Sequence, residues 1–359
     1  MSAIRNATLA TGLVAIALIA QPVHSARAET IKMTVFAGHP PVFPWVKLMD
    51  DYFIPEIDKR LAAAGGKVKI EWNRAYGGTL VKLGSESTAL KDNLGEIGFV
   101  STIFEAPKFP LQNITYYTPF GTDDISIVAR VITSLQDKIP EMKAAWTRNN
   151  AVFLGGTGLD AYYLFTKNPV AKLDDLKGLK INAPGPSANW LKETGAIAVA
   201  GSLQTYYNDI QTGVTSGTLT FSTGAFPAKV YEVAPNITKV NYGAQFGGAL
   251  AMNRRVLNHL PKDVQKIFLE TGRDYSEKFN TLLTGTSNAL MQKMVAAGAR
   301  VREVPAAERK QWADAIPNPA LPWAKDLDSK GLPGTKVLKA YMAEMKANGV
   351  TFPRDWSKP

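Results

Sequence analysis

Asn182 is the residue that first suggests chemistry in this sequence. It lies in the run Asp174–Trp190, where an apolar strand pattern leads through a Pro/Gly turn into a helix pattern. An amide side chain offers hydrogen-bond donors and an acceptor but no charge. We therefore expect this position to recognise a small polar molecule at the point where the strand meets the turn.

Groups that perform catalysis or bind metals are scarce. The absence of cysteine excludes thiolate catalysis, iron–sulfur clusters and thiolate zinc sites. The only histidines beyond residue 28 are His39 and His259, and neither has carboxylates at a metal-ligand spacing. Neither a Gly-x-Ser-x-Gly turn nor a His-Glu-x-x-His pair occurs. We expect neither an enzyme nor a bound metal or cofactor.

One glycine motif has the pattern of a dinucleotide-binding turn. Gly156–Ala161 follows the strand pattern Ala151–Leu154, as such a turn should. The next residues, Tyr162 to Thr166, are aromatic and β-branched, so they favour a second strand over a phosphate-binding helix. The motif fails this test of context. The alternative that it supports, an exported oxidoreductase, would copurify with a coloured or fluorescent cofactor.

The N-terminus has the pattern of an export signal. Arg5 precedes an apolar stretch from Leu9 to Ala20, and Ala26-Arg27-Ala28 matches a signal-peptidase site. The stretch is shorter than the roughly twenty residues that span a bilayer. We expect residues 1–28 to be removed near Ala28, which leaves a periplasmic protein that is not inserted in the membrane.

The remaining chain of about 330 residues is long enough for two domains. It contains 39 basic and 31 acidic residues, a net charge of +8. The basic residues are scattered, without the clustered face that nucleic-acid binding requires. We expect no nucleic-acid partner.

Short β-branched runs alternate with longer helical patterns, which is typical of α/β layers. Expected strands are Ile31–Phe36, Val68–Trp72, Ile97–Val100, Ala151–Leu154, Lys180–Asn182, Leu219–Phe221, Lys239–Asn241 and Ala249–Met252. Expected helices are Val46–Ala63, Leu80–Leu94, Ile125–Lys138, Glu141–Asn149, Ser187–Thr194, Gln204–Thr212, Lys262–Ala297, Ala306–Ala313 and Gly334–Asn348. Lys262–Ala297 contains no proline and predicts one long helix, or two abutting ones, that bridges both halves. Pro317–Pro322 predicts a loop.

Several segments together resemble one known family. They are Tyr76–Leu80, Gly95–Phe99, Tyr117–Phe120, Asp175–Ile181, Gly195-Ala196, Leu203–Gly217, Tyr231–Val233, Leu250–Asn253 and Leu260-Pro261. In this order and spacing, they resemble the DctP-type solute receptors of TRAP transporters, which deliver small organic acids to a membrane permease. The resemblance covers most of the chain beyond the signal.

The resemblance implies an α/β fold of two lobes, like that of type II periplasmic binding proteins, with a hinge and a long interlobe helix. Lobe I would comprise residues 29–154 plus about 246–280, and lobe II residues 155–245 plus about 281–359. A ligand would lie in the cleft between the lobes, and the permease subunits would be the partner. An ABC-importer receptor and a surface scaffold protein are alternatives.

The chain departs from the family at the position that usually binds a carboxylate. Members usually carry arginine after the Lys-Ile pair, and Asn182 stands there. Other positions that contact ligands in the family also differ. Ungapped counting from Gly217 places Thr220 where a contacting asparagine is common and Ser216 where an aspartate is usual. Counting back from Thr166 places Tyr163 where relatives often have a basic residue. The candidate ligand contacts are Asn182, Thr220, Phe221, Tyr163, Tyr162, Tyr76, Ser101, His39, Phe43 and Tyr242. These residues favour a compact organic acid with an apolar or aromatic part, although a neutral polar ligand fits Asn182 equally well.

Two helix N-termini are candidates for the missing positive potential. Ser187 is expected to cap the helix after the Pro184–Pro186 turn, and Gly77–Thr79 is expected to lead into a helix at Leu80. Backbone donors and the helix dipole at such sites attract anions. Arg74 and Lys82 are further cationic candidates near the mouth of the cleft.

Overall fold

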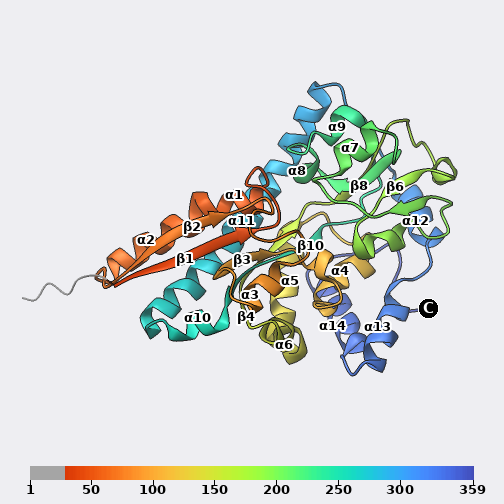
Figure 1. Ribbon diagram of the computed structural model, residues 1–359. Coiled ribbons are helices and arrows are strands. Elements are labelled where there is room, and N and C mark those ends of the chain that lie inside the picture. The colour runs from red at the N-terminus through yellow and green to blue at the C-terminus, as the bar shows by residue number, and fades with distance from the viewer. Residues whose placement is uncertain (1–28) are drawn as a thin grey trace, which may run out of the picture.

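The computed structural model describes residues 29–359, which form two β-sheets with helices around each (Figure 1). The expected signal segment, residues 1–28, lies outside the described residues. The orange elements near the N-terminus and the green elements around residue 200 lie at opposite ends of the molecule (Figure 1). The two sheets therefore belong to two separate halves.

The first sheet has five strands. Its order is β2 (Val68–Ala75), β1 (Glu29–Ala37), β3 (Ile97–Val100), β10 (Gln245–Asn253) and β4 (Ala151–Leu159). β1 runs parallel to β2 and β3, whereas β10 runs antiparallel to β3 and β4. β3 and β10 are buried along their whole length, as expected for strands covered on both faces.

The second sheet has six strands. Its order is β11 (Arg300–Glu303), β9 (Asn236–Lys239), β5 (Tyr162–Thr166), β8 (Gly217–Phe221), β6 (Lys180–Asn182) and β7 (Ile197–Val199). β5 runs antiparallel to β8 and β9, and β6 runs parallel to β7 and β8. The glycine motif lies mostly within β4 and is followed by β5, so the prediction of a second strand there is confirmed.

Helices cover both sheets. They are α1 (Pro44–Leu48), α2 (Ile54–Ala63), α3 (Glu86–Lys91), α4 (Ile114–Tyr117), α5 (Ile125–Lys138), α6 (Pro140–Arg148), α7 (Tyr206–Gln211), α8 (Ser222–Ala225), α9 (Val230–Val233), α10 (Arg254–His259), α11 (Lys262–Ala296), α12 (Ala306–Ala315), α13 (Ala320–Ser329) and α14 (Gly334–Ala347). A π-helical segment, Met49–Phe53, joins α1 to α2. Short 3₁₀ segments occupy Thr102–Glu105, Leu111–Asn113, Leu173–Leu176 and Gly185–Leu191.

Helix α5 shows how the local sequence forms these elements. Val128, Ile132 and Leu135 recur at helical spacing and are buried. The carboxylate of Asp124 accepts hydrogen bonds from two backbone N–H groups of the first turn, including that of Ser126 at 2.8 Å. The apolar stripe and the cap together account for the bounds of α5, which match the prediction.

Helix α11 links the two halves, as predicted for one long helix. It is 35 residues long and contacts β4 and α2 in the half with the first sheet and α8 in the half with the second (Figure 1). Its backbone touches that of β4 directly, because Gly155 and Gly272 leave no side chains between them. Within residues 29–359, no helix is both long and apolar enough to cross a membrane.

Two chain segments, from β4 to β5 and from β9 to β10, cross between the sheets, and the segment around Phe120 lies beside them. The backbone N–H of Phe120 donates to the carbonyl oxygen of Tyr242 at 2.6 Å, and Tyr242 N–H donates to the carbonyl oxygen of Tyr162 at 3.0 Å. From α12, the guanidinium of Arg309 donates to the carbonyl oxygens of Gly121 and Asn241, at 3.2 and 3.0 Å. These bonds tie the three segments together where the halves meet.

Several predicted elements are wrong in part, including the helix expected over 187–194, where a 3₁₀ segment forms instead. The helix expected from Leu80 begins only at Glu86, because the chain turns at Gly77, Gly78 and Gly84, each with positive φ. The strand expected over 239–241 ends at Lys239, and Asn241 adopts φ +56°. The loop expected over 317–322 ends at Pro319, because α13 begins at Ala320.

Candidate ligand-binding site

A cavity of about 30 Å³ lies between the two halves. Both sheets contribute to its walls. The lining residues are His39, Trp45, Phe99, Ser101, Ile103, Phe104, Leu159 and Gly247 from the side of the first sheet, and Tyr162, Pro184, Leu203, Tyr206, Thr220 and Phe221 from the side of the second. A water molecule needs about 10–15 Å³ of such space, so the cavity has room for about two. The two halves are therefore closed on each other.

Aromatic rings form much of the wall. Phe43 and Trp45 stack with their centroids 5.0 Å apart and their planes 5° apart. The imidazole of His39 lies edge-on to Trp45 at 5.1 Å, and Trp45 faces Phe221 across the cavity at 6.2 Å. The segment after β1 and the end of β8 thus bring flat apolar surfaces to one place, which suits a ligand with a planar or apolar part.

Two polar atoms in this wall are buried and have no hydrogen-bond partner among residues 29–359. They are the indole Nε1 of Trp45 and the hydroxyl Oγ1 of Thr220. Buried polar groups are normally hydrogen-bonded, so each is an open position for a ligand atom or a water. The hydroxyl of Ser101 adds a third polar group, 3.5 Å from His39 Nδ1.

The cavity is electrically neutral. Among residues 29–359, no lysine, arginine, aspartate or glutamate lines it. Burial lowers the pKa of His39 to about 3, so its imidazole is neutral at pH 7. Burial also raises the pKa of Tyr162 and of Tyr206, which keeps both phenols protonated. No group of three or more residues among those described has the composition of a metal site.

Gln204 closes the edge of the cavity by bonding across it. Its side-chain Nε2 donates to the carbonyl oxygen of Gly38 at 3.0 Å, which joins the segment before α7 to the segment after β1. Gly38 has to be glycine here, because a Cβ atom would lie 2.5 Å from Glu86 Oε1 and 2.6 Å from Leu83 Cα. The backbone of Gly38, next to His39, therefore packs directly against the side chain of Glu86.

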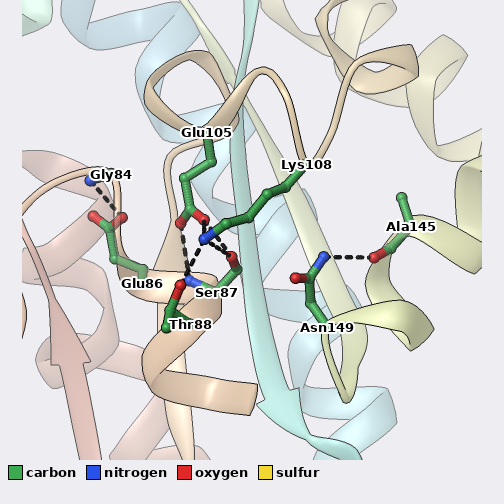
Figure 2. Close-up of polar contacts among 8 residues, drawn as sticks. All are labelled: Gly84, Glu86, Ser87, Thr88, Glu105, Lys108, Ala145 and Asn149. Atoms are coloured by element: carbon green, nitrogen blue, oxygen red, sulfur yellow. Dashed lines mark hydrogen bonds and ion pairs between the residues drawn. The ribbon is translucent and has the colours of Figure 1, made fainter. Parts of the chain in front are cut away.

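Glu86 belongs to a buried polar cluster behind this segment (Figure 2). Its Oε2 accepts a hydrogen bond from the backbone N–H of Gly84 at 2.8 Å, while its Oε1 has no hydrogen-bond partner among the described residues. Beside it, Glu105 accepts bonds from Ser87, and Lys108 Nζ reaches Glu105 at 2.8 Å. Burial and the charge of Glu105 raise the pKa of Glu86. Glu86 is therefore protonated at neutral pH.

A family model matches residues 56–320 of the chain, well over half its length. The family is that of bacterial extracellular solute-binding proteins, family 7, or DctP. The chain belongs to the DctP family. DctP proteins are solute-binding receptors rather than enzymes.

One sequence relative within the DctP family is a solute-binding protein of Sulfitobacter sp. (strain NAS-14.1). It is 30% identical over 200 residues, which are 54% of this chain and 57% of the relative. This match therefore spans somewhat more than half the length of that relative.

Two solved structures have the same fold. A TRAP solute-binding protein from Rhodoferax ferrireducens T118, in complex with copurified benzoate, has a TM-score of 0.77 at 19% identity over 89% of this chain and 98% of that one. A TRAP protein from Bordetella bronchiseptica with bound mandelate has a TM-score of 0.74 at 21% identity over 89% and 99%. These likenesses confirm the expected two-lobe α/β fold with its long helix.

The structure brings together five of the ten expected contacts in this DctP-family chain. His39, Ser101, Tyr162, Thr220 and Phe221 line the cavity, and Phe43 stacks behind Trp45. The other four residues point elsewhere. Tyr76 donates to Asp50, Tyr163 lies 5.6 Å from Lys239 Nζ, Tyr242 stacks on Trp190, and Asn182 is bonded within its own half.

Asn182 lies beside the cavity but not in its wall. Its Oδ1 accepts a hydrogen bond from the hydroxyl of Thr215 at 2.8 Å, and its Nδ2 donates to Asp209 at 3.2 Å and to the carbonyl oxygen of Ala200 at 3.4 Å. The side chain is completely buried, and these partners use all of its polar atoms. Asn182 thus holds the loop before α7 and the turn after it against β6.

The cationic candidates do not reach the cavity either. Arg74 pairs with Asp50 at 2.8 Å, and Lys82 is not among the lining residues. Ser187 was expected to cap a helix, but its hydroxyl donates to the carbonyl oxygen of Pro184 at 2.7 Å inside a 3₁₀ segment. The helix expected at Leu80 begins six residues later, at Glu86. Neither expected anion site is therefore formed as predicted.

Sequence reasoning missed several wall residues. Tyr206 comes from a predicted helix and Leu203 directly precedes it, while Phe99 and Ile103 come from a predicted strand and the turn after it. Their apolar character predicted burial but could not distinguish the cavity wall from the core. Position at or just after the end of a strand, as for Phe99 and Ile103, was the signal that could have indicated a binding site, since ligands of α/β proteins often bind there.

Proposed function

We propose that the chain is the extracytoplasmic receptor of a TRAP transporter and binds a compact organic acid with an apolar or aromatic part. The observation that carries this proposal is the cavity, which both halves build from aromatic rings and from polar atoms without protein partners. A pocket of this kind, mostly apolar with a few converging polar groups, is typical of small-molecule sites.

The proposed contacts are the expected residues His39, Ser101, Tyr162, Thr220 and Phe221, together with Trp45 and Tyr206. Trp45 Nε1–H would donate to a ligand oxygen, and Thr220 would donate or accept. The rings of Trp45 and Phe221, 6.2 Å apart in the closed structure, would sandwich the apolar part after a small separation. The benzoate and mandelate bound by the two similar structures are acids of this size and shape.

The proposed mechanism is closure around the ligand. A ligand that touches both halves favours the closed state by the free energy that it cannot gain in the open one. The permease would then distinguish the closed receptor from the open receptor. For this movement we propose lobe I as residues 29–154 plus about 246–280 and lobe II as 155–245 plus about 281–359, with the ends of β4 and β10 crossing between them.

The proposed location is the periplasm, after removal of residues 1–28. The family description, extracellular solute-binding protein, supports export. Edman sequencing or intact mass of protein secreted from its own precursor would test the cleavage, which we expect near Ala28. An uncleaved, cell-associated chain would contradict it.

Native mass spectrometry of freshly purified protein tests the binding function, because a tightly held ligand survives purification. A thermal-shift screen with benzoate, mandelate and pyroglutamate follows, with benzamide as the uncharged control. We expect at least one acid to raise the melting temperature in a concentration-dependent way. No copurified ligand and no shift with any acid would overturn the proposal.

A further inference from the structure

An acid ligand poses an electrostatic problem for this cavity. A carboxylate buried without a cationic partner loses its hydration, which is costly. Among residues 29–359 no basic side chain lines the cavity, and the position where an arginine was expected holds Asn182, whose amide is used within its own half. Neutral donors such as Trp45 Nε1–H supply hydrogen bonds but no charge, so a group that gains a proton on binding would supply the compensating charge.

Of the described residues, His39 supplies the one imidazole in the wall. It is 4% exposed and lies edge-on to Phe43, Trp45 and Phe104, with centroid distances of 5.5, 5.1 and 6.0 Å. Among residues 29–359, the ring has one polar contact, between Nδ1 and the hydroxyl of Ser101 at 3.5 Å. No carboxylate within the same range bonds to the ring, and burial disfavours the imidazolium.

The other ionisable groups near His39 are neutral or already paired, so they do not supply a positive charge for the ligand carboxylate. Those that share its cavity are the phenols of Tyr162 and Tyr206, and both remain neutral. Behind the adjacent Gly38 lies Glu86, which burial keeps protonated. Farther back, Lys108 is paired with Glu105, and on the other half Asp209 is bonded to Asn182.

We propose that an acid ligand and a proton enter the cavity together, with His39 carrying the proton and serving as the counter-ion of the ligand carboxylate. The proposal rests on the proposed function and assigns a specificity role to His39. A simple carboxylic acid is ionised in solution at pH 6–8, so the proton comes from the solvent. The bound state is then a neutral pair of imidazolium and carboxylate inside an apolar wall.

The sign of the pH dependence follows from linkage. Burial holds the pKa of His39 at about 3 in the free protein, and a carboxylate in contact with the ring raises it. Between these two values, each ligand that binds takes up one proton. The dissociation constant therefore increases by about tenfold per pH unit as the pH rises.

Isothermal titration calorimetry tests the proposal with whichever of benzoate, mandelate and pyroglutamate binds the wild-type protein. The titrations cover pH 5.5 to 8.0, in two buffers of different ionisation enthalpy at each pH, which gives the number of protons taken up. We expect about one proton per ligand and about a tenfold change in the dissociation constant per pH unit. His39→Gln should lose the proton uptake, whereas His259→Gln should keep it, since His259 is exposed and bonds to the Arg255 carbonyl.

A spectroscopic measurement does not depend on the folding of His39→Gln. After removal of the signal the chain has two histidines, so ¹⁵N-histidine labelling gives two sets of ring signals. Addition of the acid at pH 7 should convert the His39 ring from the neutral to the imidazolium pattern and leave His259 unchanged.

The outcomes separate the two proposals. Acid binding with no pH dependence, or a slope that persists in His39→Gln, overturns the role of His39 and leaves the receptor function intact. A His39 ring that stays neutral in the complex also overturns it, as does tight, pH-independent binding of benzamide. Binding of none of the acids at any pH overturns the proposed function and this inference with it.

Discussion

Thr218 and Thr220 lie two positions apart on β8, so their side chains leave the same face of the sheet. The hydroxyl of Thr218 donates to the carbonyl oxygen of Asn182 at 3.3 Å, whereas that of Thr220 has no partner among residues 29–359 and lines the cavity. A buried hydroxyl without a partner adds nothing to folding stability. Thr220 is therefore better explained by binding than by folding.

Replacing each threonine with valine separates the two roles. Thr220→Val should leave the melting temperature unchanged or raise it, and should weaken binding of the acid by about 3- to 10-fold, the effect of one hydrogen bond. Thr218→Val should lose about 1 kcal/mol of unfolding free energy and retain affinity. Thermal melts and calorimetry on both variants check this. A Thr220→Val protein that is destabilised with unchanged affinity would contradict the assignment.

Glu86 makes the stability of the protein depend on pH. Burial first, and then the charge of Glu105, raise its pKa from 4.5 to about 8 in the folded protein. Between these values the folded state keeps a proton that the unfolded state releases. The free energy of unfolding therefore falls as the pH rises through this range, by at most about 1.4 kcal/mol per pH unit.

Glu86→Gln removes this titration while keeping the shape of the side chain. Relative to wild type, the variant should gain stability steadily from pH 5 to pH 8, because the neutral amide needs no proton to remain buried. Urea unfolding at pH 5, 6.5 and 8 measures the difference. Two stability curves that run parallel across this range would show that Glu86 is not the titrating group.

At the scale of elements, α11 and β4 are in backbone contact. A Cβ atom on Gly272 would lie 2.6 Å from Leu154 Cβ and 2.9 Å from the Leu154 carbonyl oxygen. Gly285 is on the same helix, but it is exposed, and nothing lies within 4 Å of its added Cβ. The two glycines therefore differ in packing but not in secondary structure.

Gly272→Ala should destabilise the protein by about 1–3 kcal/mol, since the extra methyl group forces the helix and the strand apart. Gly285→Ala should stabilise it by up to about 1 kcal/mol, because alanine favours the helix. Chemical unfolding of both variants tests the contrast, and the Gly285 variant controls for the general effect of alanine. Equal effects of the same sign would exclude backbone contact as the cause.

Elements with strong local signals were predictable. The bounds predicted for α5 are correct, and β3 and β6 were also predicted to the residue. The helix over 80–94 was too long because the left-handed turns at Gly78 and Gly84 depend on the contacts of the folded chain. Asn182 lies in its predicted strand, but its amide bonds to three partners within its own half and does not line the cavity. These partners are 18 to 33 residues away in sequence, and local sequence patterns do not predict such distant contacts.

At the scale of the whole molecule, the balance between open and closed states decides function. The segments from β4 to β5 and from β9 to β10 join the halves on one side of the cavity, where Arg309 and the Phe120 segment bond to them. On the other side, Gln204 bonds to Gly38 across the gap. A single hydrogen bond there contributes about 0.5–1.5 kcal/mol, which is enough to change the ratio of closed to open molecules by about 2- to 10-fold.

Gln204→Ala should therefore shift the free protein toward the open state. Small-angle scattering should show a larger radius of gyration without ligand, and acid binding should weaken by about 2- to 10-fold through faster dissociation. Gln265→Ala is the control, because that amide bonds to the Asn258 and Leu260 carbonyls within its own half. Both variants lose an amide-to-carbonyl bond, but only one loses a bond between the halves. If both scatter and bind alike, closure does not depend on the contact between Gln204 and Gly38, and the aromatic contacts across the cavity hold the halves together on their own.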